Sequence, residues 1–384
     1  MALIGRFFQD PKVSFFLFGP RGTGKSTWTR EQYPQALVID LLMPDAQRTF
    51  AARPERLEQL VEANTEKSPV VIDEIQKAPA LLDVVHRLME SRKGYRFVLT
   101  GSSARKLRRG GVDLLAGRAV NKSLHPFMAA ELGEDFDLAR ALRMGMLPVV
   151  HDSKAPQETL DAYVSLYLKE EVQAEGIVRS IGDFARFLEA VSFSHAAVLN
   201  ISEIARECQV GRKTVEGYLS IAEDLLIAVR LPVFSRRAKR QLTVHPKLYL
   251  FDVGVYRSLR PRGPLDRPQE IDGAALEGLV FQHLRAWAAY GAGDQRLYFW
   301  RTKSGSEIDF VVYGEQSFAA IEVKNAGTVR AKDLNSLKAF GQDYGQAERL
   351  LLYRGKERLM IEGILCLPCE RFLKDLVPGK PLPL

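Results

Sequence analysis

The stretch that decides the fold is Phe15-Phe16-Leu17-Phe18-Gly19-Pro20-Arg21-Gly22-Thr23-Gly24-Lys25-Ser26. Its first four residues are apolar and predict a buried strand. Residues 19–26 then have the G-x-x-x-x-G-K-S spacing of a phosphate-binding loop. Glycines let backbone N–H groups turn toward phosphate oxygens, and the helix predicted over residues 27–32 presents its positive end to the same anion.

Two side chains of this loop have specific roles in phosphate chemistry. Lys25 would reach the β- and γ-phosphates of ATP, and Ser26 would place its hydroxyl on Mg²⁺. The alternative is a glycine-rich turn that matches by chance, but the predicted strand and helix on either side argue against it. The predicted nucleotide-binding residues of the loop are Gly19, Pro20, Arg21, Gly22, Thr23, Gly24, Lys25, Ser26 and Thr27.

Length and composition indicate a globular protein of two or three domains. The chain has 384 residues, of which 46% are hydrophobic and 26% charged. A formal net charge of +7 permits a nucleic-acid partner without requiring one. Three cysteines exclude a disulfide framework and favour a reducing cytoplasm. Cys366 and Cys369 lack the second pair that a zinc site needs, and no apolar run is long enough to span a membrane.

A second nucleotide motif follows at Pro69-Val70-Val71-Ile72-Asp73-Glu74. This apolar run ends in two carboxylates, which is the Walker B form. A continuous apolar run is typical of a strand buried on both faces. We expect Asp73 to hold the Mg²⁺ shell and Glu74 to orient the attacking water. The alternative, a strand that happens to end in acidic residues, is weakened by the phosphate loop at Lys25.

The next predicted strand, residues 96–100, ends at Gly101-Ser102-Ser103. In AAA-type ATPases this position holds a polar sensor for the γ-phosphate. Ser102 is the first candidate and Thr100 the second. The alternative role for Ser102 or Ser103 is to cap the helix that follows.

Arginines and lysines follow this strand. Arg118, in Leu115-Ala116-Gly117-Arg118, is a candidate for stabilising charge on the transferring phosphoryl group, with a purely structural role as the alternative. A basic cluster precedes it, and it forms either a solvated face or a contact to DNA or a neighbouring subunit. The cluster consists of Arg105, Lys106, Arg108 and Arg109.

Residues 1–125 therefore predict an α/β domain of the P-loop, AAA type. Strands are expected at residues 36–41 and helices at 53–64 and 79–91, besides the elements named above. The order of motifs fits a parallel sheet with helices on both faces. One additional strand would lie between the loop strand and the strand that ends at Glu74, with ATP at the carboxyl ends of the strands.

Residues 126–245 predict a helical region that ends in a winged helix-turn-helix. A short helix at 203–207, a turn at 209–211, a helix at 212–226 and a strand to 234 follow one another. Arg212, Lys213 and Thr214 begin the second helix, where DNA contacts would fall. The alternative is an internal connector. The loop that follows would suit phosphate contacts through Arg236, Arg237, Lys239 and Arg240.

Residues 246–384 predict a second α/β domain, with a helix over 274–290 and a hairpin of strands at 305–312 and 319–324. Alternation along the strands places Ile308, Phe310 and Val312 on one face. Asp309, Glu322 and Lys324 then share a polar face. The two carboxylates could bind Mg²⁺, with Mn²⁺ as an alternative, and Lys324 could help activate water. This D…E-x-K pattern is the core of the PD-(D/E)xK nucleases, whose fold is that of the restriction endonucleases.

Taken together, the chain resembles the bacterial and archaeal AAA-type ATPases that carry a C-terminal domain of unknown function with a PD-(D/E)xK nuclease-like core. The resemblance implies ATP binding at the phosphate loop and a helix glutamate, here Glu277, that completes the C-terminal site. One departure is Met144-Gly145-Met146-Leu147-Pro148, where relatives often carry a G-G-x-P turn. The resemblance rests on residues 19–26, 72–76, 100–103, 115–118, 248–254, 300–310 and 321–324.

Two functions compete at this stage. The first is a cytoplasmic ATPase that couples Mg-ATP hydrolysis to DNA binding and metal-dependent DNA cleavage or remodelling, on branched or unwound DNA. The second is an ATP-driven switch whose nuclease-like domain binds a partner or DNA without cleaving it. Both predict a homo-oligomer, with a ring as one form, because ATPases of this class often receive an arginine from a neighbouring subunit.

Overall fold

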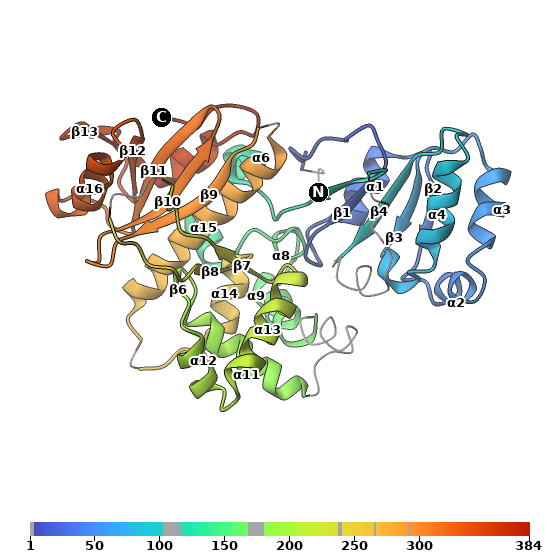
Figure 1. Ribbon diagram of the computed structural model, residues 1–384, viewed down its shortest axis with the longest axis horizontal. Coiled ribbons are helices and arrows are strands. Elements are labelled where there is room, and N and C mark those ends of the chain that lie inside the picture. Colours follow the sequence, from blue (N-terminus) through green and yellow to red (C-terminus); the bar gives the residue numbers. More distant parts are fainter. Residues whose placement is uncertain are drawn as a thin grey trace. The chain divides into compact units, whose positions relative to one another are not determined.

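The computed structural model describes residues 4–102, 115, 117–167, 180–236, 240–264, 266–291 and 293–384 (Figure 1). Contacts divide the chain into two compact units. The N-terminal unit consists of Phe8–His125 with Asp224–Leu226, and the C-terminal unit of the described residues in Met1–Phe7, Pro126–Glu223 and Ile227–Leu384. The predicted basic cluster at residues 105–109, together with Ser103, Ala116, Arg237 and Lys239, lies outside the described residues.

A parallel five-stranded sheet forms the centre of the N-terminal unit. Its order is β2-β3-β4-β1-β5, and every pairing is parallel. Strand β4 therefore lies between β1 and β3, which confirms the additional strand expected from the motif order. The strands are β1 (Phe15–Phe18), β2 (Leu37–Asp40), β3 (Val70–Asp73), β4 (Phe97–Gly101) and β5 (Val120–Ser123).

Helices cover both faces of this sheet. Trp28 of α1 (Lys25–Gln32) lies edge-on to Phe15 of β1, with ring centroids 6.3 Å apart. On the other face, Phe16 and Ile72 belong to a core cluster shared with α2 (Pro44–Ala52), α3 (Arg56–Ala63) and α4 (Leu81–Glu90). The short helix η1 spans Ile75–Lys77. The three strands β1, β3 and β4 are buried along their whole length, as continuous apolar runs predict.

The first part of the C-terminal unit is mostly helical. Helix α11, strand β6, helices α12 and α13, and strands β7 and β8 follow in that order, and the strands form an antiparallel sheet of order β6-β8-β7. The elements are α6 (Ala129–Leu132), η2 (Gly133–Asp135), α7 (Leu138–Met144), α8 (Pro148–His151), α9 (Pro156–Ala162), η3 (Tyr163–Tyr167), α11 (Ile181–Ser192), β6 (Ala197–Val198), α12 (Ile201–Glu207), α13 (Arg212–Asp224), β7 (Ala228–Leu231), β8 (Lys247–Leu250) and α14 (Val253–Leu259).

A mixed six-stranded sheet forms the second part, in the order β13-β14-β12-β11-β10-β9. Phe281 of α15 stacks on Phe310 of β10, whereas Phe340 of α16 meets Trp300 of β9 in the core cluster on the other face. The elements are α15 (Pro268–Tyr290), β9 (Arg296–Arg301), β10 (Glu307–Gly314), β11 (Ser317–Lys324), η4 (Ala331–Leu334), α16 (Asn335–Asp343), β12 (Glu348–Tyr353), β13 (Leu359–Ile361), β14 (Ile364–Pro368) and α17 (Cys369–Asp375).

Strict alternation along β10 is wrong at one point. The pairing of β10 with β9 shifts register between Ile308 and Val311, and both residues pack into the same core cluster. The predicted common face of Ile308, Phe310 and Val312 is therefore wrong, because Phe310 stacks on α15 on the other side of the sheet. Two residues three apart share a face only where the strand contains a bulge, and a bulge re-aims the side chains beside it. Asp309 lies inside this bulge, so its direction could not be derived from a period of two.

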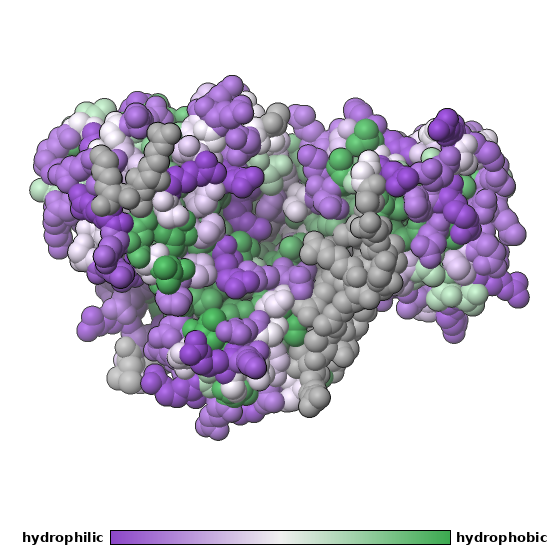
Figure 2. All heavy atoms as spheres, viewed as in Figure 1, coloured by the Kyte–Doolittle hydropathy of each residue, from purple (hydrophilic) through white to green (hydrophobic). Residues whose placement is uncertain are grey.

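The face of the two units drawn in Figure 2 is largely hydrophilic. In the face drawn in Figure 2, purple atoms cover most of the exterior of each unit, and the apolar side chains named above lie inside. Within the described parts of the chain, no helix has the length and apolar character needed to cross a bilayer.

Candidate functional site

The phosphate loop connects β1 to α1 through backbone that glycine alone accommodates well. Gly22 and Gly24 have φ angles of +80° and +89°, in the left-handed region. A Cβ atom on Gly19 would lie 2.5 Å from the carbonyl oxygen of Leu124. The loop therefore needs glycine at these three positions.

Lys25 is buried and lies across the loop. Its Nζ donates to the carbonyl oxygens of Gly19, at 2.7 Å, and Pro20, at 3.2 Å. The Thr23 hydroxyl also donates to the carbonyl of Pro20, at 2.8 Å. These bonds hold the ammonium inside the curve of the loop. Arg21 and Ser26 are half-buried, and Thr27 is exposed on the first turn of α1.

The two Walker B carboxylates lie at the carboxyl end of β3 and contact the end of β4. The hydroxyl of Thr100 donates to Oδ1 of Asp73, which is 3% exposed. The same oxygen of Thr100 accepts the backbone N–H of Glu74 at 3.1 Å. Glu74 has φ and ψ of +61° and +50°, so this carboxylate is carried on left-handed backbone.

Gln76 connects Glu74 to the predicted sensor. Its Nε2 donates to a carboxylate oxygen of Glu74 and, at 3.2 Å, to the hydroxyl of Ser102. The two sensor candidates therefore differ in their contacts. Thr100 bonds Asp73 and the backbone of Glu74 directly, whereas Ser102 reaches Glu74 only through the side-chain amide of Gln76. The sequence pattern assigns no role to Gln76, although this residue stands two positions after the glutamate of the motif.

The parallel sheet brings these residues to one edge. Since β1, β4 and β3 are neighbours and run in one direction, Gly19, Ser102 and Asp73 all follow the carboxyl ends of their strands. The donors available for a metal ion are the carboxylate of Asp73 and the hydroxyl of Ser26. Mg²⁺ is usually held by one or two such oxygen ligands and the phosphates of the substrate, so these residues fit Mg-ATP.

Arg118 lies at the opposite edge of the sheet. Strand β5 runs parallel to β1, and its first residue, Val120, pairs with Phe15, the first residue of β1. Arg118 precedes β5, so it lies close to the amino ends of the strands. Its guanidinium pairs with Glu90 at the end of α4. The structure therefore does not bring Arg118 to the phosphate loop of its own chain.

In the C-terminal unit, the predicted acidic residues surround a lysine. The Nζ of Lys247, the first residue of β8, lies 2.9 Å from Glu277 of α15, 2.5 Å from Glu307 and 3.1 Å from Asp309 of β10. The side chain of Lys247 is 1% exposed. We call these three acids and Lys247 the carboxylate cluster. The hydroxyl of Tyr249 also donates to Glu277, at 2.6 Å.

Burial and charge act in opposite directions on the pKa values of the cluster. Burial alone lowers the pKa of the Lys247 ammonium, but the carboxylates outweigh it and hold this pKa well above its usual value. Burial and the charge of Asp309 raise the pKa of Glu277 to about 7, against the opposing effect of Lys247.

Glu322 and Lys324 form a separate pair beside the cluster. The Nζ of Lys324 lies 2.5 Å from Oε1 of Glu322, which is 5% exposed. Oε2 of Glu322 has no hydrogen-bond partner among the described residues. Burial and the charge of Asp309 raise the pKa of Glu322 well above its ordinary value. Phe310 pairs with Ile321, which makes Asp309 and Glu322 the next residues along the two strands.

These contacts do not fit a bound metal ion. One carboxylate oxygen of Asp309 accepts from Lys247, and the other accepts the backbone N–H of Val323 at 2.9 Å. Throughout the described ranges, no group of three or more His, Cys, Asp or Glu side chains is arranged to hold a metal. Cys366 and Cys369 are buried and free. The structure thus brings the four predicted residues Glu277, Asp309, Glu322 and Lys324 together, but with their charges already paired.

Sequence reasoning missed Lys247, Tyr249 and Glu307. A signal did exist, because Lys247 begins the apolar run Leu248-Tyr249-Leu250-Phe251, and the structure buries all four residues of the strand from Lys247 to Leu250. A lysine in a fully buried strand requires a carboxylate partner. The identity of that partner depends on segments that are distant along the chain.

The carboxylate of Asp252 stabilises the Met144–Pro148 turn by hydrogen bonding. Oδ2 of Asp252 accepts the backbone N–H of Met146 at 2.7 Å, and Oδ1 accepts those of Gly254 and Val255 at the start of α14. A Cβ atom on Gly145, whose φ is +74°, would lie 1.9 Å from Oδ1 of Asp252. The turn therefore needs glycine at position 145, because any side chain there would clash with Asp252. It forms without the second glycine of the G-G-x-P pattern.

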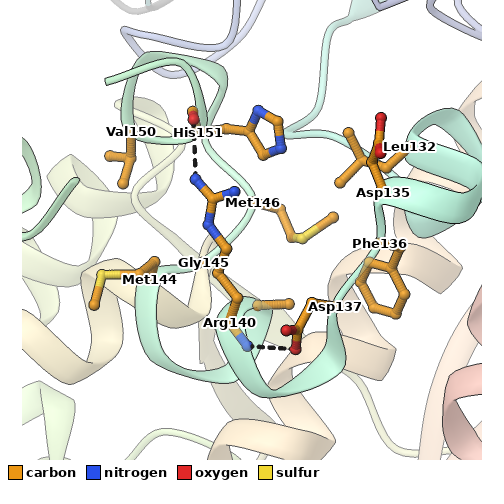
Figure 3. Close-up of a pocket in the computed structure, with 11 residues that line it drawn as sticks. Leu132, Asp135, Phe136, Asp137, Arg140, Met144, Gly145, Met146, Val150 and His151 are labelled. Atoms are coloured by element: carbon orange, nitrogen blue, oxygen red, sulfur yellow. Dashed lines mark hydrogen bonds between the residues drawn. The ribbon is translucent and has the colours of Figure 1, made fainter. Parts of the chain in front are cut away.

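Figure 3 shows the small pocket beside this turn. The guanidinium of Arg140 donates to the carbonyl of His151, and the backbone N–H of Arg140 donates to Asp137. The cavity measures about 10 Å³, roughly the space of one water molecule, so it is not a nucleotide site.

Comparison with known proteins agrees with the N-terminal motifs. An AAA domain model matches residues 12–133. Two models of domains of unknown function match the remainder, DUF8612 at residues 135–266 and DUF4143 at residues 272–372.

Two relatives match most of the chain. Uncharacterized proteins of Mycobacterium tuberculosis and Mycobacterium bovis are each 26% identical over 375 residues, which cover 93% of this chain and 80% of the relative. A crystal structure of a Vibrio cholerae protein is 12% identical, covers 94% of this chain and 96% of its own, and has a TM-score of 0.20. The match at residues 12–133 supports an ATPase of the AAA type, and the C-terminal match fits the domain of unknown function that the resemblance implied.

Proposed function

We propose that the N-terminal unit hydrolyses Mg-ATP. The observation that carries this proposal is the arrangement at one sheet edge, where the phosphate loop lies at the end of β1 and Thr100 bonds both Asp73 and Glu74. Backbone N–H groups of the loop and Lys25 would bind the phosphates. Ser26 and Asp73 would hold Mg²⁺, which when bound would supply positive charge to the phosphate oxygens. Glu74, fixed by Thr100 and Gln76, orients the attacking water.

Steady-state ATP hydrolysis and direct ATP binding test this proposal. Lys25→Ala should lose both, because phosphate charge is then poorly neutralised. Glu74→Gln should keep ATP binding and lose at least about 100-fold in kcat, the usual size of a general-base effect. Lys67→Ala, an exposed lysine of the same unit, is the matched control and should resemble the wild type. Full hydrolysis by Glu74→Gln would contradict the assignment.

We also propose that Arg118 acts on the nucleotide of a neighbouring subunit. Its place at the end of the sheet away from its own phosphate loop fits a role at the site of a second copy, with a structural role through the ion pair with Glu90 as the alternative. Separately inactive Arg118→Ala and Lys25→Ala proteins should then recover part of the activity when mixed, because a mixed assembly contains complete sites. Light scattering with and without ATP measures the assembly. No recovery in an assembled mixture would remove Arg118 from the site.

DNA contact by α13 is the second part of the proposal. Gly211, Arg212, Lys213 and Thr214 are all exposed at the start of α13, and neither basic residue makes an ion pair with a described residue. The order helix, strand, helix, helix, strand, strand around the β6-β8-β7 sheet supports a winged helix. Free basic side chains at this point suit phosphate contacts.

Two other basic residues of the predicted interface are already engaged. Arg236 lies over the ring of Tyr313, 4.8 Å from its centroid, and Arg240 pairs with Asp343 at 3.0 Å. The test therefore concerns α13. Fluorescence anisotropy of labelled duplex, single-stranded and branched DNA should show weaker binding by Arg212→Ala/Lys213→Ala, with a salt slope smaller by about two. The exposed pair Lys356→Ala/Arg358→Ala is the matched control.

The contacts in the C-terminal unit do not support DNA cleavage. The ammonium of Lys247 pairs with Asp309, and Lys324 pairs with Glu322, so these carboxylates are engaged by lysines rather than arranged around a metal ion. Of the two functions that the sequence left open, these contacts favour the ATP-driven switch that binds without cleaving.

A further inference from the structure

Lys247 makes three contacts with three acids on two different elements. Glu277 comes from α15, and Glu307 and Asp309 from β10, all within 3.1 Å of Nζ. An ammonium group has three N–H donors, so these contacts use all of them. The ring of Phe299, with its centroid 5.7 Å from Nζ, lies on a further side.

A divalent ion in this place would need the oxygens that Lys247 occupies. Mg²⁺ binds oxygen at about 2.0–2.1 Å in an octahedral shell, and an ammonium that contacts the same carboxylates prevents that approach. Among the fully buried carboxylate oxygens of the described residues, Oε2 of Glu322 has no hydrogen-bond partner, and one such oxygen cannot form a site alone. Burial of several carboxylates requires a cation, and the chain itself supplies it.

We propose that Lys247 is a tethered cation that takes the place of a divalent metal ion in the carboxylate cluster, and that removing its amine converts the cluster into a divalent-cation site. Glu277, Glu307 and Asp309 would then be the ligands. This inference concerns the C-terminal unit alone and is independent of ATP hydrolysis.

Mn²⁺ binding to the full-length, nucleotide-free protein tests the proposal, measured by isothermal titration or electron paramagnetic resonance. Lys247→Met, which keeps the length of the side chain, should bind one Mn²⁺ per chain more than the wild type. The added Asp309→Asn should remove that ion. Lys324→Met is the matched control, because Lys324 pairs with Glu322 alone and its loss frees no group of three carboxylates.

Two outcomes would overturn the proposal. One is a folded Lys247→Met protein that binds no additional Mn²⁺. The other is a wild-type protein that binds Mn²⁺ in a manner abolished by Asp309→Asn, since Lys247 would then not exclude the ion. The second comparison needs no lysine variant, so it holds even if Lys247→Met fails to fold.

Thermal unfolding gives a second readout. Mn²⁺ should raise the Tm of Lys247→Met by several degrees, because a ligand that binds only the folded state stabilises it. The same ion should leave the Tm of the wild type and of Lys247→Met/Asp309→Asn unchanged. Since none of these measurements involves ATP, a failed ATPase assay and a failed metal assay remain distinguishable.

Discussion

Lys25 and Lys247 are both buried lysines, 5% and 1% exposed, in sites that the sequence motifs located. Lys25 is held by carbonyl oxygens five and six residues away along the chain. Lys247 is held by carboxylates of which two are 30 and 62 residues away. The first lysine is held by carbonyl dipoles and has an anionic ligand only in the proposed function, whereas the second pairs with anions of its own chain. A motif therefore identifies a site of the first kind more completely than one of the second.

The largest expected effect comes from Lys247→Met. Removing one partner of a buried ion pair leaves uncompensated charge and typically costs about 3–5 kcal/mol of the free energy of unfolding. Denaturant unfolding of the C-terminal unit would measure it. Lys324→Met, at a more exposed ion pair, should cost less. An equal loss of the free energy of unfolding in Lys247→Met and Lys324→Met would contradict the distinction between Lys247 and the Lys324–Glu322 ion pair.

Next is Lys25→Met, which should act on rate more than on stability. Loss of one charge that stabilises the transferring phosphoryl group lowers kcat/KM by roughly 100- to 1000-fold, or about 3–4 kcal/mol. ATP hydrolysis and thermal unfolding of the same preparation would separate the two effects. A loss of stability as large as that of Lys247→Met would mean that Lys25 is mainly structural.

Acid sensitivity is the third prediction and concerns His283. Burial lowers the pKa of His283 to about 4, and its ring bonds the N–H of Ala129 and the carbonyl of Leu279. Because the folded pKa is depressed below 6.5, this stabilisation is complete above pH 6.5 and is lost as pH falls through about 4. The loss amounts to about 3 kcal/mol.

His283→Gln should therefore flatten the decline of the free energy of unfolding between pH 6.5 and 4. Exposed His245→Gln is the control in the same unit and should keep the wild-type slope. Identical slopes for all three proteins would show that His283 does not carry the acid response.

The smallest expected effect is that of Thr100→Val. Valine has the same shape but removes the hydroxyl that bonds Asp73 and Glu74. Leaving buried polar groups without this partner costs about 1–3 kcal/mol. The Tm and kcat should both fall. Ser14→Ala is the control, because it also removes a buried hydroxyl, one that accepts the backbone N–H of Phe97 in β4, and it should lower the Tm alone. Unchanged kcat would remove Thr100 from the catalytic arrangement.

Local patterns predicted the N-terminal unit well. The loop, the strand that ends at Asp73 and the strand before Ser102 can each be recognised from consecutive residues. Parallel pairing of these strands then places their carboxyl ends together. Helix α2 was missed because Pro44–Ala52 has one buried residue, Phe50, and so no apolar stripe. The roles of the individual site residues stay predictions.

The C-terminal unit shows where such patterns stop. Alternation predicted that Asp309 and Glu322 would lie together. The charge that Asp309 contacts is instead decided by the bulge after Ile308 and by Lys247, which comes from another strand. Arg118 stands in a plausible motif, yet strand direction places it at the far edge from its own loop. Both corrections depend on pairing between distant segments, which no short window of sequence contains.

The left-handed backbone of Glu74 has an evolutionary consequence. A glutamate at φ +61° costs roughly 1–2 kcal/mol that asparagine or glycine would largely avoid. Selection for stability alone would favour either replacement, and both would remove the carboxylate while leaving the phosphate loop intact. Versions of this domain that bind ATP without hydrolysing it are thus one substitution away, and a retained glutamate at this position is a sign that hydrolysis is under selection.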